Sequence, residues 1–252
     1  MTACRDLTAP DAADSGVGFA YRHKALRDLG GDFLDICRTA RGCDVLVADV
    51  AGHDMSASYH TVLIKAFFEE NCRRGNDGEA FFRILNHSLL ESGRNERMVT
   101  ACFLRIDLRR LSAEIVSAGH PRVIKLRRDV PVPYPVYANG SVLGLMEDVV
   151  FDTKHFAVAP GDRVFLYTDG VTGAVRVDGP TGERATLGED GLEELLAATR
   201  RLPLDRQVDV VWEEVLRHCR RKQTDDMLFV GIEIPGAAGT DAAASGEEGG
   251  EA

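Results

Sequence analysis

The sequence predicts an α/β protein of the α+β type, in which two mostly antiparallel sheets pack face to face and carry a helix pair on each outer side. Two observations support this prediction. Segments with a two-residue apolar alternation outnumber helical segments, and the helical segments come in two pairs, one in the middle of the chain and one near its end. Two packed sheets with a helix pair outside each satisfy that order, because every element then buries its apolar face.

Length and composition describe an ordinary soluble globular protein. The chain has 252 residues, of which 44% are hydrophobic and 28% charged, enough for a full core in one large domain or two small ones. The formal charge is -10. The stretch from residue 235 onward contains four acids and no Lys or Arg, which leaves -6 on the rest. A charge of that sign argues against non-specific binding to nucleic acid or to an anionic membrane.

Cysteine usage and hydropathy predict a cytoplasmic protein. The six cysteines are scattered, with no C-x-x-C and no histidine pair at zinc spacing, so a reducing compartment is expected. The first thirty residues contain no apolar signal core, and no apolar run is long enough to span a membrane. Residues 1–16 are expected to form a flexible leader or the remnant of an upstream linker, residues 17–234 the folded domain, and residues 235–252 a disordered acidic tail.

The individual elements follow from apolar periodicity and from turn residues. Strands are predicted at residues 17–24, 33–39, 44–50, 98–107, 112–118, 122–128, 149–158, 163–168 and 227–234. Helices are predicted at residues 55–73, 79–90, 190–199 and 205–221. The proline-rich stretch 129–145 is predicted to be a loop, and Asp169-Gly170 a turn.

Apolar positions at helical spacing indicate which helix faces should pack on the sheets. In the first helix they are Met55, Tyr59, Val62, Leu63, Ala66 and Phe67. In the last helix they are Val208, Val211, Trp212, Val215, Leu216 and Cys219. Asn86, near the end of the second helix, is expected to make a helix-to-loop hydrogen bond.

Four aspartates lie where predicted strands begin or end. Asp49 and Asp169 close strands, whereas Asp32 and Asp225 open them. Because the ends of some antiparallel strands share a sheet edge with the starts of others, the four side chains could converge on one pocket. A buried carboxylate without a partner is costly, and a cation is one way to hold it there. Oxygen ligands without imidazole or thiolate favour Mg²⁺ or Mn²⁺ over zinc or copper.

Each aspartate taken singly also has an ordinary structural explanation. Gly30-Gly31-Asp32 can be only a turn, and Asp49 can cap the helix that follows it. Asp169-Gly170 can be a hairpin turn, and Asp225-Asp226 a solvated pair. These explanations require four independent coincidences, so the metal site is favoured. Of the adjacent pair only one side chain can face the pocket, because neighbouring strand residues point to opposite faces.

Short motifs along the chain carry a family resemblance. In order from Gly30 to Met227, they are G-G-D-F-x-D, A-D-V-A-G-H, V-T-A, A-G-H-P, L-G, P-G-D, Y-T-D-G-V-T and D-D-M. Together they resemble the PPM family of metal-dependent serine/threonine phosphatases (type 2C), in particular its bacterial branch of stage II sporulation protein E and stress-response phosphatases. The resemblance covers roughly residues 17–234.

The resemblance implies an α-β-β-α sandwich with two Mn²⁺ or Mg²⁺ ions between the sheets. In the family pattern the position of Asp49 bridges both ions and is the central catalytic side chain, and the carbonyl of Val50 is a further ligand. The remaining ligands match Asp32, Asp169 and Asp225, the first of the final pair. The implied reaction is attack of a metal-bridging water on phosphoserine or phosphothreonine. The implied partner is a phosphorylated protein of the anti-sigma-factor antagonist type, and an upstream sensor or receiver domain is a possible second partner.

The sequence departs from the family pattern at two places. Gly52-His53-Asp54 stands where the family usually has G-H-G, and Thr172-Gly173 stands where it has T-E. Asp54 could cap the following helix or place negative charge beside the phosphate site. His53 is a candidate general acid for the leaving seryl oxygen, or a merely structural histidine. Gly173 leaves the metal ligands untouched.

Two other functions compete with an active phosphatase. One is a low-activity regulatory binding module that keeps the fold and docks a phosphoprotein partner. Loss of a metal aspartate would favour it, and none is lost here. The other, a nucleotide-binding domain, lacks both a G-x-G-x-x-G turn after a strand and a P-loop lysine.

Overall fold

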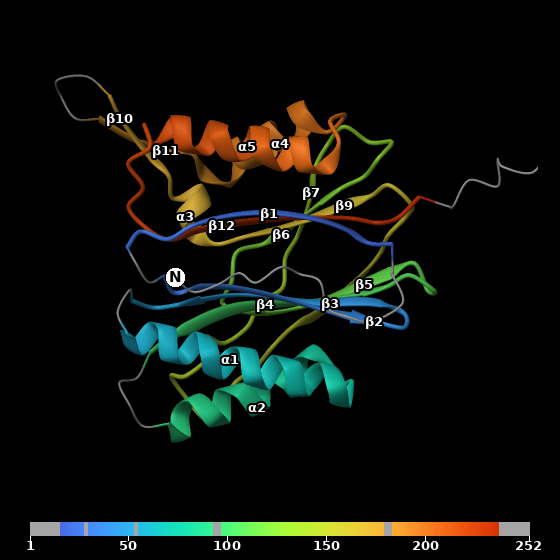
Figure 1. Cartoon of the computed structure of the whole chain (residues 1–252), viewed down its shortest axis with the longest axis vertical. Helices are drawn as coiled ribbons and strands as arrows, with labels where there is room; N and C mark the ends of the chain where they lie inside the picture. Colours follow the sequence, from blue (N-terminus) through green and yellow to red (C-terminus); the bar gives the residue numbers. More distant parts are fainter. Residues whose placement is uncertain (1–15, 28–29, 53–54, 93–96, 179–182, 237–252) are drawn as a thin grey trace, which may run out of the picture.

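The computed structural model describes residues 16–27, 30–52, 55–92, 97–178 and 183–236. Within these residues, two five-stranded antiparallel sheets face each other, and helices cover both outer sides (Figure 1). The predicted fold class is therefore confirmed. The expected leader and acidic tail fall almost entirely outside the described residues. No helix in the described ranges is long and apolar enough to cross a membrane.

The first sheet, sheet A, carries the C-terminal helices on its outer face. Its strands in spatial order are β1 (Gly18–Lys24), β12 (Met227–Glu233), β9 (Arg163–Tyr167), β6 (Val123–Leu126) and β7 (Tyr134–Val136). The covering helices are α4 (Gly188–Thr199) and α5 (Leu204–His218). The predicted apolar stripe of α5 is confirmed, because the whole stripe is buried against the sheet.

The second sheet, sheet B, carries the middle helix pair. Its strands in spatial order are β2 (Asp32–Thr39), β3 (Gly42–Val50), β4 (Val99–Asp107), β5 (Ser112–Ala118) and β8 (Thr153–Ala157). The covering helices are α1 (Met55–Arg74) and α2 (Gly78–Glu91). Strand β3 is buried on both faces: Val45 and Val47 pack between the sheets, and Leu46 and Ala48 pack under the helices. That double burial explains its unbroken apolar sequence.

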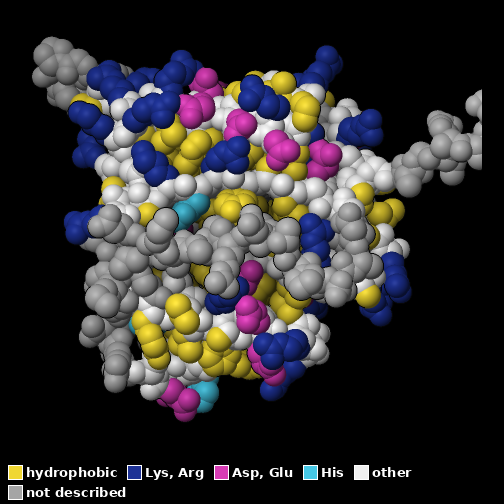
Figure 2. Space-filling view, viewed as in Figure 1, with side chains coloured by type: hydrophobic (Ala, Val, Ile, Leu, Met, Phe, Trp, Pro, Cys, Tyr) yellow, Lys and Arg dark blue, Asp and Glu magenta, His cyan; other side chains and the backbone are white. Residues whose placement is uncertain are grey.

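The face that helix α1 presents to the sheet matches the predicted one only in part: Leu63 and Phe67 pack partly buried against the core, whereas other members of the predicted stripe are exposed. Tyr59 and Val62 are 57% and 63% exposed, and Figure 2 shows hydrophobic side chains on the surface over α1. The buried face instead contains Ala57, Ile64 and Phe68. It was missed because the same face also contains buried polar side chains, which interrupt its apolar pattern: His60, Thr61 and Asn71.

Three features were not predicted as regular structure. Strand β7 lies within the expected proline-rich loop, and it is tolerated because Pro135 sits in an edge strand. The expected turn at Asp169-Gly170 is the start of a short helix, α3 (Asp169–Thr172). Strands β10 (Val175–Asp178) and β11 (Glu183–Thr186) form a separate two-stranded sheet. These four-residue strands alternate apolar residues with charges too briefly to signal a strand.

The helix-to-loop role of Asn86 is confirmed. Its amide nitrogen donates to the Met146 carbonyl at 2.9 Å, and its amide oxygen accepts from the Gly144 backbone at 2.8 Å. The side chain thereby ties α2 to the long connection between β7 and β8.

Candidate metal centre

Asp32 and Asp49 lie directly opposite each other on neighbouring strands. They are register partners in the antiparallel pair of β2 and β3. Side chains at such positions stand on the same face of a sheet with Cβ atoms about 4.5–5.5 Å apart. Like charges in that arrangement repel, so this pair alone makes the edge of sheet B electrostatically unfavourable without a counter-charge.

Asp169 and Asp225 lie together at one end of sheet A. Asp169 follows β9, and Asp225 precedes β12 by two residues. Because β9 and β12 are antiparallel neighbours, the end of the first lies beside the start of the second. The structure thus brings these two aspartates to one edge, as the strand-boundary argument expected.

Thr168 joins the two sheet edges. Its side-chain hydroxyl donates to Asp32 Oδ2 at 2.7 Å and accepts from the Leu228 backbone N–H at 2.9 Å. The side chain is fully buried, so both contacts are protected from water. A residue of sheet A therefore fixes a carboxylate of sheet B. Sequence reasoning gave this threonine no role, and only its place inside the Y-T-D-G motif could have pointed to it.

The pKa values show that the aspartates act on one another. Burial raises the pKa of Asp32 to about 8, with the charges of Asp49, Asp226 and Asp169 acting in the same direction and the Thr168 hydrogen bond opposing them. Burial and the charges of Asp169, Asp225 and Asp226 raise the pKa of Asp49 to about 6. The pKa of Asp169 is raised as well, first by burial and then by Asp225. A bound cation would relieve all of these repulsions at once.

Asp226 accepts two hydrogen bonds from the backbone. Its two carboxylate oxygens accept hydrogen bonds from the backbone N–H groups of Leu26 and Gly31, each at 2.6 Å. It is 6% exposed, whereas Asp225 is exposed at the rim. This difference favours Asp225 as the metal ligand. Asp226 instead holds the loop before β2 against the start of β12 through its two hydrogen bonds.

Alanine substitutions in this pair should therefore have separate effects. Asp225→Ala is expected to weaken metal affinity measured by calorimetry while leaving thermal stability nearly unchanged. Asp226→Ala should lower the free energy of unfolding by about 1–3 kcal/mol, because the buried Gly31 N–H and the partly buried Leu26 N–H lose their acceptor. A larger loss of metal affinity in Asp226→Ala than in Asp225→Ala would reverse the assignment.

Two motif glycines are required by close backbone approach. A Cβ at Gly31 would lie 2.2 Å from the Val50 carbonyl oxygen, and the Val50 N–H donates to the Gly31 carbonyl at 3.2 Å. A Cβ at Gly170 would lie 1.9 Å from the Asp226 carbonyl oxygen. Any side chain at either position would push apart the segments that carry the aspartates.

Arg97 is a second residue that sequence reasoning missed. Its guanidinium donates to the Ala51 carbonyl at 2.5 Å, and a Cβ at Gly52 would lie 1.9 Å from its Nη1 atom. A positive charge therefore rests against the backbone directly after Asp49 and Val50. No motif includes this arginine, so only the folded chain reveals its place. His53 and Asp54, the candidate general acid and the departure beside it, lie outside the described residues.

His120 is a buried neutral residue behind the site. Its backbone N–H donates to Ser117 Oγ at 3.2 Å, and its ring Nδ1 lies 3.2 Å from Thr100 Oγ1. Burial lowers its pKa to about 3, against a weaker opposite effect of a backbone hydrogen bond to Tyr167. Since Thr100 pairs with Asp49 across β3 and β4, His120 supports the strand next to the carboxylates.

The donor set suits a hydrated Mg²⁺ or Mn²⁺ ion. The residues in question offer only carboxylate and carbonyl oxygens, which these hard cations prefer. Within the described part of the chain, no three His, Cys, Asp or Glu side chains already form a group that could hold an ion. Mg²⁺ usually keeps several waters and binds through one or two carboxylates, so a closed cage of protein ligands is not needed.

Comparisons with known proteins identify the family of this chain. The model of the family described as Stage II sporulation protein E (SpoIIE) matches residues 39–235, which include each proposed ligand except Asp32. Phosphoserine phosphatase RsbP from Bacillus subtilis (strain 168) is 28% identical over 172 residues, covering 66% of this chain and 42% of RsbP. The chain spans less than half the length of the curated relatives it matches.

Solved structures show the same fold. The RsbU and RsbW domains of Rv1364c from Mycobacterium tuberculosis superpose with a TM-score of 0.75 at 18% identity, covering 89% of this chain and 61% of that one. RsbX in complex with magnesium has a TM-score of 0.63 at 16% identity, covering 86% of this chain and 94% of RsbX. Because the family model covers most of the sequence and the fold agrees, the chain belongs to the stage II sporulation protein E family.

Proposed function

We propose that this chain is a metal-dependent phosphoprotein phosphatase that hydrolyses phosphoserine or phosphothreonine. The observation that carries the proposal is that Asp169 and Asp225 of sheet A lie near enough to Asp49 of sheet B to raise its pKa, and that Asp49 has Asp32 as its register partner. The similarity to RsbP, a phosphoserine phosphatase, supports the substrate class. The magnesium in the RsbX structure supports the use of a divalent ion.

Each residue has a distinct role in this proposal. Two Mg²⁺ or Mn²⁺ ions would supply an activated water and positive charge for the phosphoryl oxygens. Asp49 would hold both ions, while Asp32, Asp169, Asp225 and the Val50 carbonyl would complete the protein ligands. Thr168 would orient the Asp32 carboxylate through the hydrogen bond that it donates.

A small regulatory phosphoprotein of the anti-sigma-factor antagonist type is the proposed substrate. The support comes from relatives: RsbP acts on phosphoserine, and one structural neighbour joins RsbU and RsbW domains in a single protein. A sensor or receiver domain acting on this one is part of the same proposal, because the chain spans less than half of RsbP. The cytoplasm is the proposed location, as expected from the cysteine pattern.

The test is hydrolysis of a phosphoserine peptide with Mn²⁺ or Mg²⁺, compared with the same protein in EDTA. Turnover that requires the ion and returns when excess ion is added supports the phosphatase. Saturable binding of the phosphopeptide without turnover, under either ion, would instead support a regulatory binding module.

His53 is proposed to protonate the leaving seryl oxygen, since it follows Asp49 by four residues in the sequence. His53→Ala should slow a phosphoserine peptide by about 10²-fold or more and an aryl phosphate far less, because the aryl leaving group needs little protonation. The measurement is the ratio of kcat/KM for the two substrates in each protein. Equal losses on both substrates would reduce His53 to a structural role.

A further inference from the structure

A concave pocket lies at the end of the sandwich opposite the aspartates. It has a volume of about 540 Å³ and is lined by the start of β9, the end of β12, the loop after β6 and the segment between α4 and α5. Strand β9 leads from Arg163 toward Asp169, and β12 leads from Asp225 toward Glu233. The pocket and the aspartates therefore occupy opposite ends of the same two strands. At about 3.3 Å per strand residue they are roughly 20 Å apart.

The pocket carries an excess of positive charge in a protein whose formal charge is -10. Its charged lining residues are Arg127, Arg128, Arg163, Arg200, Arg201, Asp129 and Glu233. Both acids are already paired: Glu233 with Arg163 at 2.5 Å, and Asp129 with Arg127 at 3.3 Å. Among the described residues, the guanidinium groups of Arg128, Arg200 and Arg201 have no carboxylate partner. The Arg200 Nη1 atom donates to the Ala197 carbonyl at 3.0 Å, but no carboxylate neutralises any of these three positive charges within the described residues.

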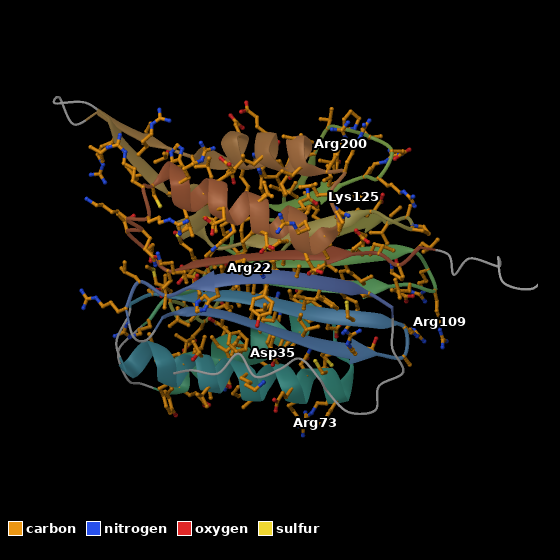
Figure 3. The ribbon with its side chains drawn as sticks, turned by 45° about the horizontal axis from the view of Figure 1, so that its top comes forward. Arg22, Asp35, Arg73, Arg109, Lys125 and Arg200 are labelled. Carbon is orange, nitrogen blue, oxygen red and sulfur yellow. The ribbon has the colours of Figure 1, made fainter. Side chains whose placement is uncertain are left out.

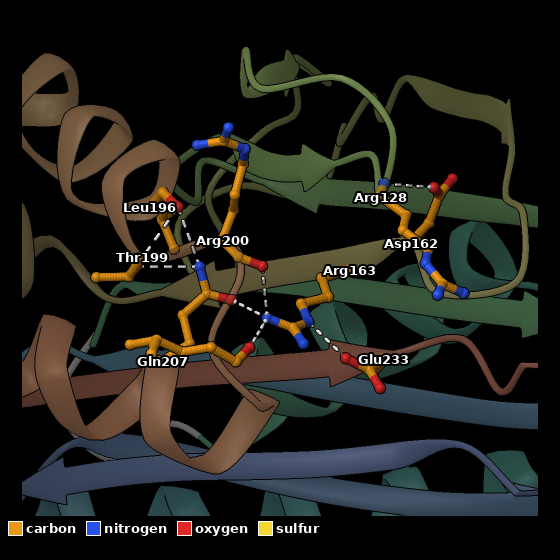
Figure 4. A network of polar contacts seen from close by, with 9 residues as sticks. Arg128, Asp162, Arg163, Leu196, Thr199, Arg200, Gln207 and Glu233 are labelled. Carbon is orange, nitrogen blue, oxygen red and sulfur yellow. Dashed lines mark hydrogen bonds and ion pairs between the residues drawn. The ribbon is translucent and has the colours of Figure 1, made fainter.

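One wall of the pocket is fixed by a partly buried hydrogen-bond network (Figure 4). The Arg163 Nη1 atom donates to the Leu202 carbonyl at 2.8 Å, to the Arg200 carbonyl at 3.3 Å and to Gln207 Oε1 at 2.6 Å. Gln207 is fully buried, and its amide nitrogen donates to Leu196 of α4 at 3.1 Å. The backbone that carries Arg200 and Arg201 is therefore held in place before any ligand arrives, which lowers the cost of binding.

Arg128 lies on the other wall, across from Arg163 and Arg200 in Figure 4. Its backbone N–H donates to Asp162 Oδ1 at 3.2 Å, and the Asp162 carboxylate is paired with Lys125 at 3.0 Å. The Arg128 side chain crosses the turn at Gly161, where a Cβ would come within 2.6 Å of its Cδ atom. Gly161 has φ +83°, so a glycine serves both the turn and the passage of the arginine.

We propose that this pocket binds a small molecule carrying two or more phosphate groups, such as a nucleoside diphosphate or triphosphate. The planar guanidinium group suits phosphate oxygens because it can donate two parallel hydrogen bonds. Arginines approach from two walls, so a ligand with phosphates at both sides satisfies more of them than a single phosphate does. The volume lies within the 300–1,000 Å³ range of small-molecule sites. The site is separate from the metal centre and does not depend on the proposed phosphatase activity.

The sequence that follows the pocket is acidic. Gly236 lines the pocket, and the sequence after it contains four acids and no Lys or Arg. An experiment on this pocket must therefore compare the full chain with a chain that ends at Gly236.

The test is calorimetric titration of the full chain with ATP and with inorganic pyrophosphate, in EDTA and about 50 mM NaCl. EDTA prevents phosphate from binding through metal ions at the aspartates. We expect one-site binding of at least one probe, with affinity at least about tenfold weaker in the double variant Arg128→Ala/Arg201→Ala. Both arginines are exposed, so the fold should be kept. The control is Arg73→Ala, 70% exposed in the α1 layer on the far side of the sandwich from Arg200 (Figure 3).

Each outcome decides the proposal. Equal binding by the full and truncated chains, lost only in the double variant, supports a small-molecule phosphate site. Absence of saturable binding, or an equal loss in Arg73→Ala, would overturn it. Binding that is seen only after truncation would assign the pocket to the chain's own acidic segment and would also overturn it.

Discussion

Asp49→Asn is expected to abolish metal-dependent phosphatase activity while the protein stays folded. Asparagine keeps the size of the side chain but removes the charge that would hold both ions. Metal assistance to phosphoryl transfer is worth several kcal/mol, and about 4 kcal/mol corresponds to a loss of about 10³-fold in rate. The measurement is kcat with a phosphoserine peptide at saturating Mn²⁺, together with a thermal melt of the same sample.

The matched control is Asp152→Asn, the same chemical change at a side chain that is 44% exposed and directly precedes strand β8. It should leave kcat within about twofold of the wild type. Near-wild-type turnover in Asp49→Asn at saturating Mn²⁺ would show that the metal centre has been assigned to the wrong residues.

The metal-free protein is expected to lose stability as the pH rises. In an unfolded chain these carboxyl groups ionise near pH 4, whereas burial and mutual repulsion raise the pKa of Asp49 to about 6 and that of Asp32 to about 8. The folded protein therefore binds more protons than the unfolded chain between about pH 4 and pH 8. Its stability is fully present below that window and falls through it.

The corresponding experiment is a series of thermal melts in EDTA from pH 5 to pH 8.5. A loss of 2 kcal/mol would lower Tm by about 4–8 °C in a domain of this size. Asp32→Asn should remove much of that dependence, and saturating Mg²⁺ should remove it in the wild type by neutralising the carboxylates. A wild-type Tm that is as steep in pH as that of Asp32→Asn would contradict the assignment of the effect to this carboxyl group.

The sequence predicts elements well where one kind of residue fills one face. The stripe of α5 is uniformly apolar and was placed correctly, whereas α1 buries His60 and Asn71 and leaves Tyr59 exposed. The rule that apolar residues lie inside fails there, because the packing of the helix against neighbouring elements decides which face is covered, even where a buried amide such as that of Asn71 has no hydrogen-bond partner among the described residues. Strands β10 and β11 were not predicted, because four residues are too few to show a clear alternation.

The sequence indicates the candidate aspartates of the site but not the residues that hold them in place. The aspartates occur at strand boundaries within recognisable motifs, so their positions could be inferred from one sequence. Thr168 and Arg97 act through a single hydroxyl and a single guanidinium that reach segments distant in the chain. Such contacts depend on how the two sheets are stacked, which local sequence patterns do not specify.

The stacking of the sheets gives the Thr168 hydroxyl a further consequence. Asp32 lies on sheet B, while Asp169 and Asp225 lie at the end of sheet A. The distances between these carboxylates therefore depend on the position of one sheet relative to the other. The Thr168 to Asp32 bond is 2.7 Å long and would break after a shear of about 1 Å. Substitutions of residues between the two sheets, far from any ligand, can therefore change the spacing of the carboxylates and weaken metal binding without any contact with the ligands.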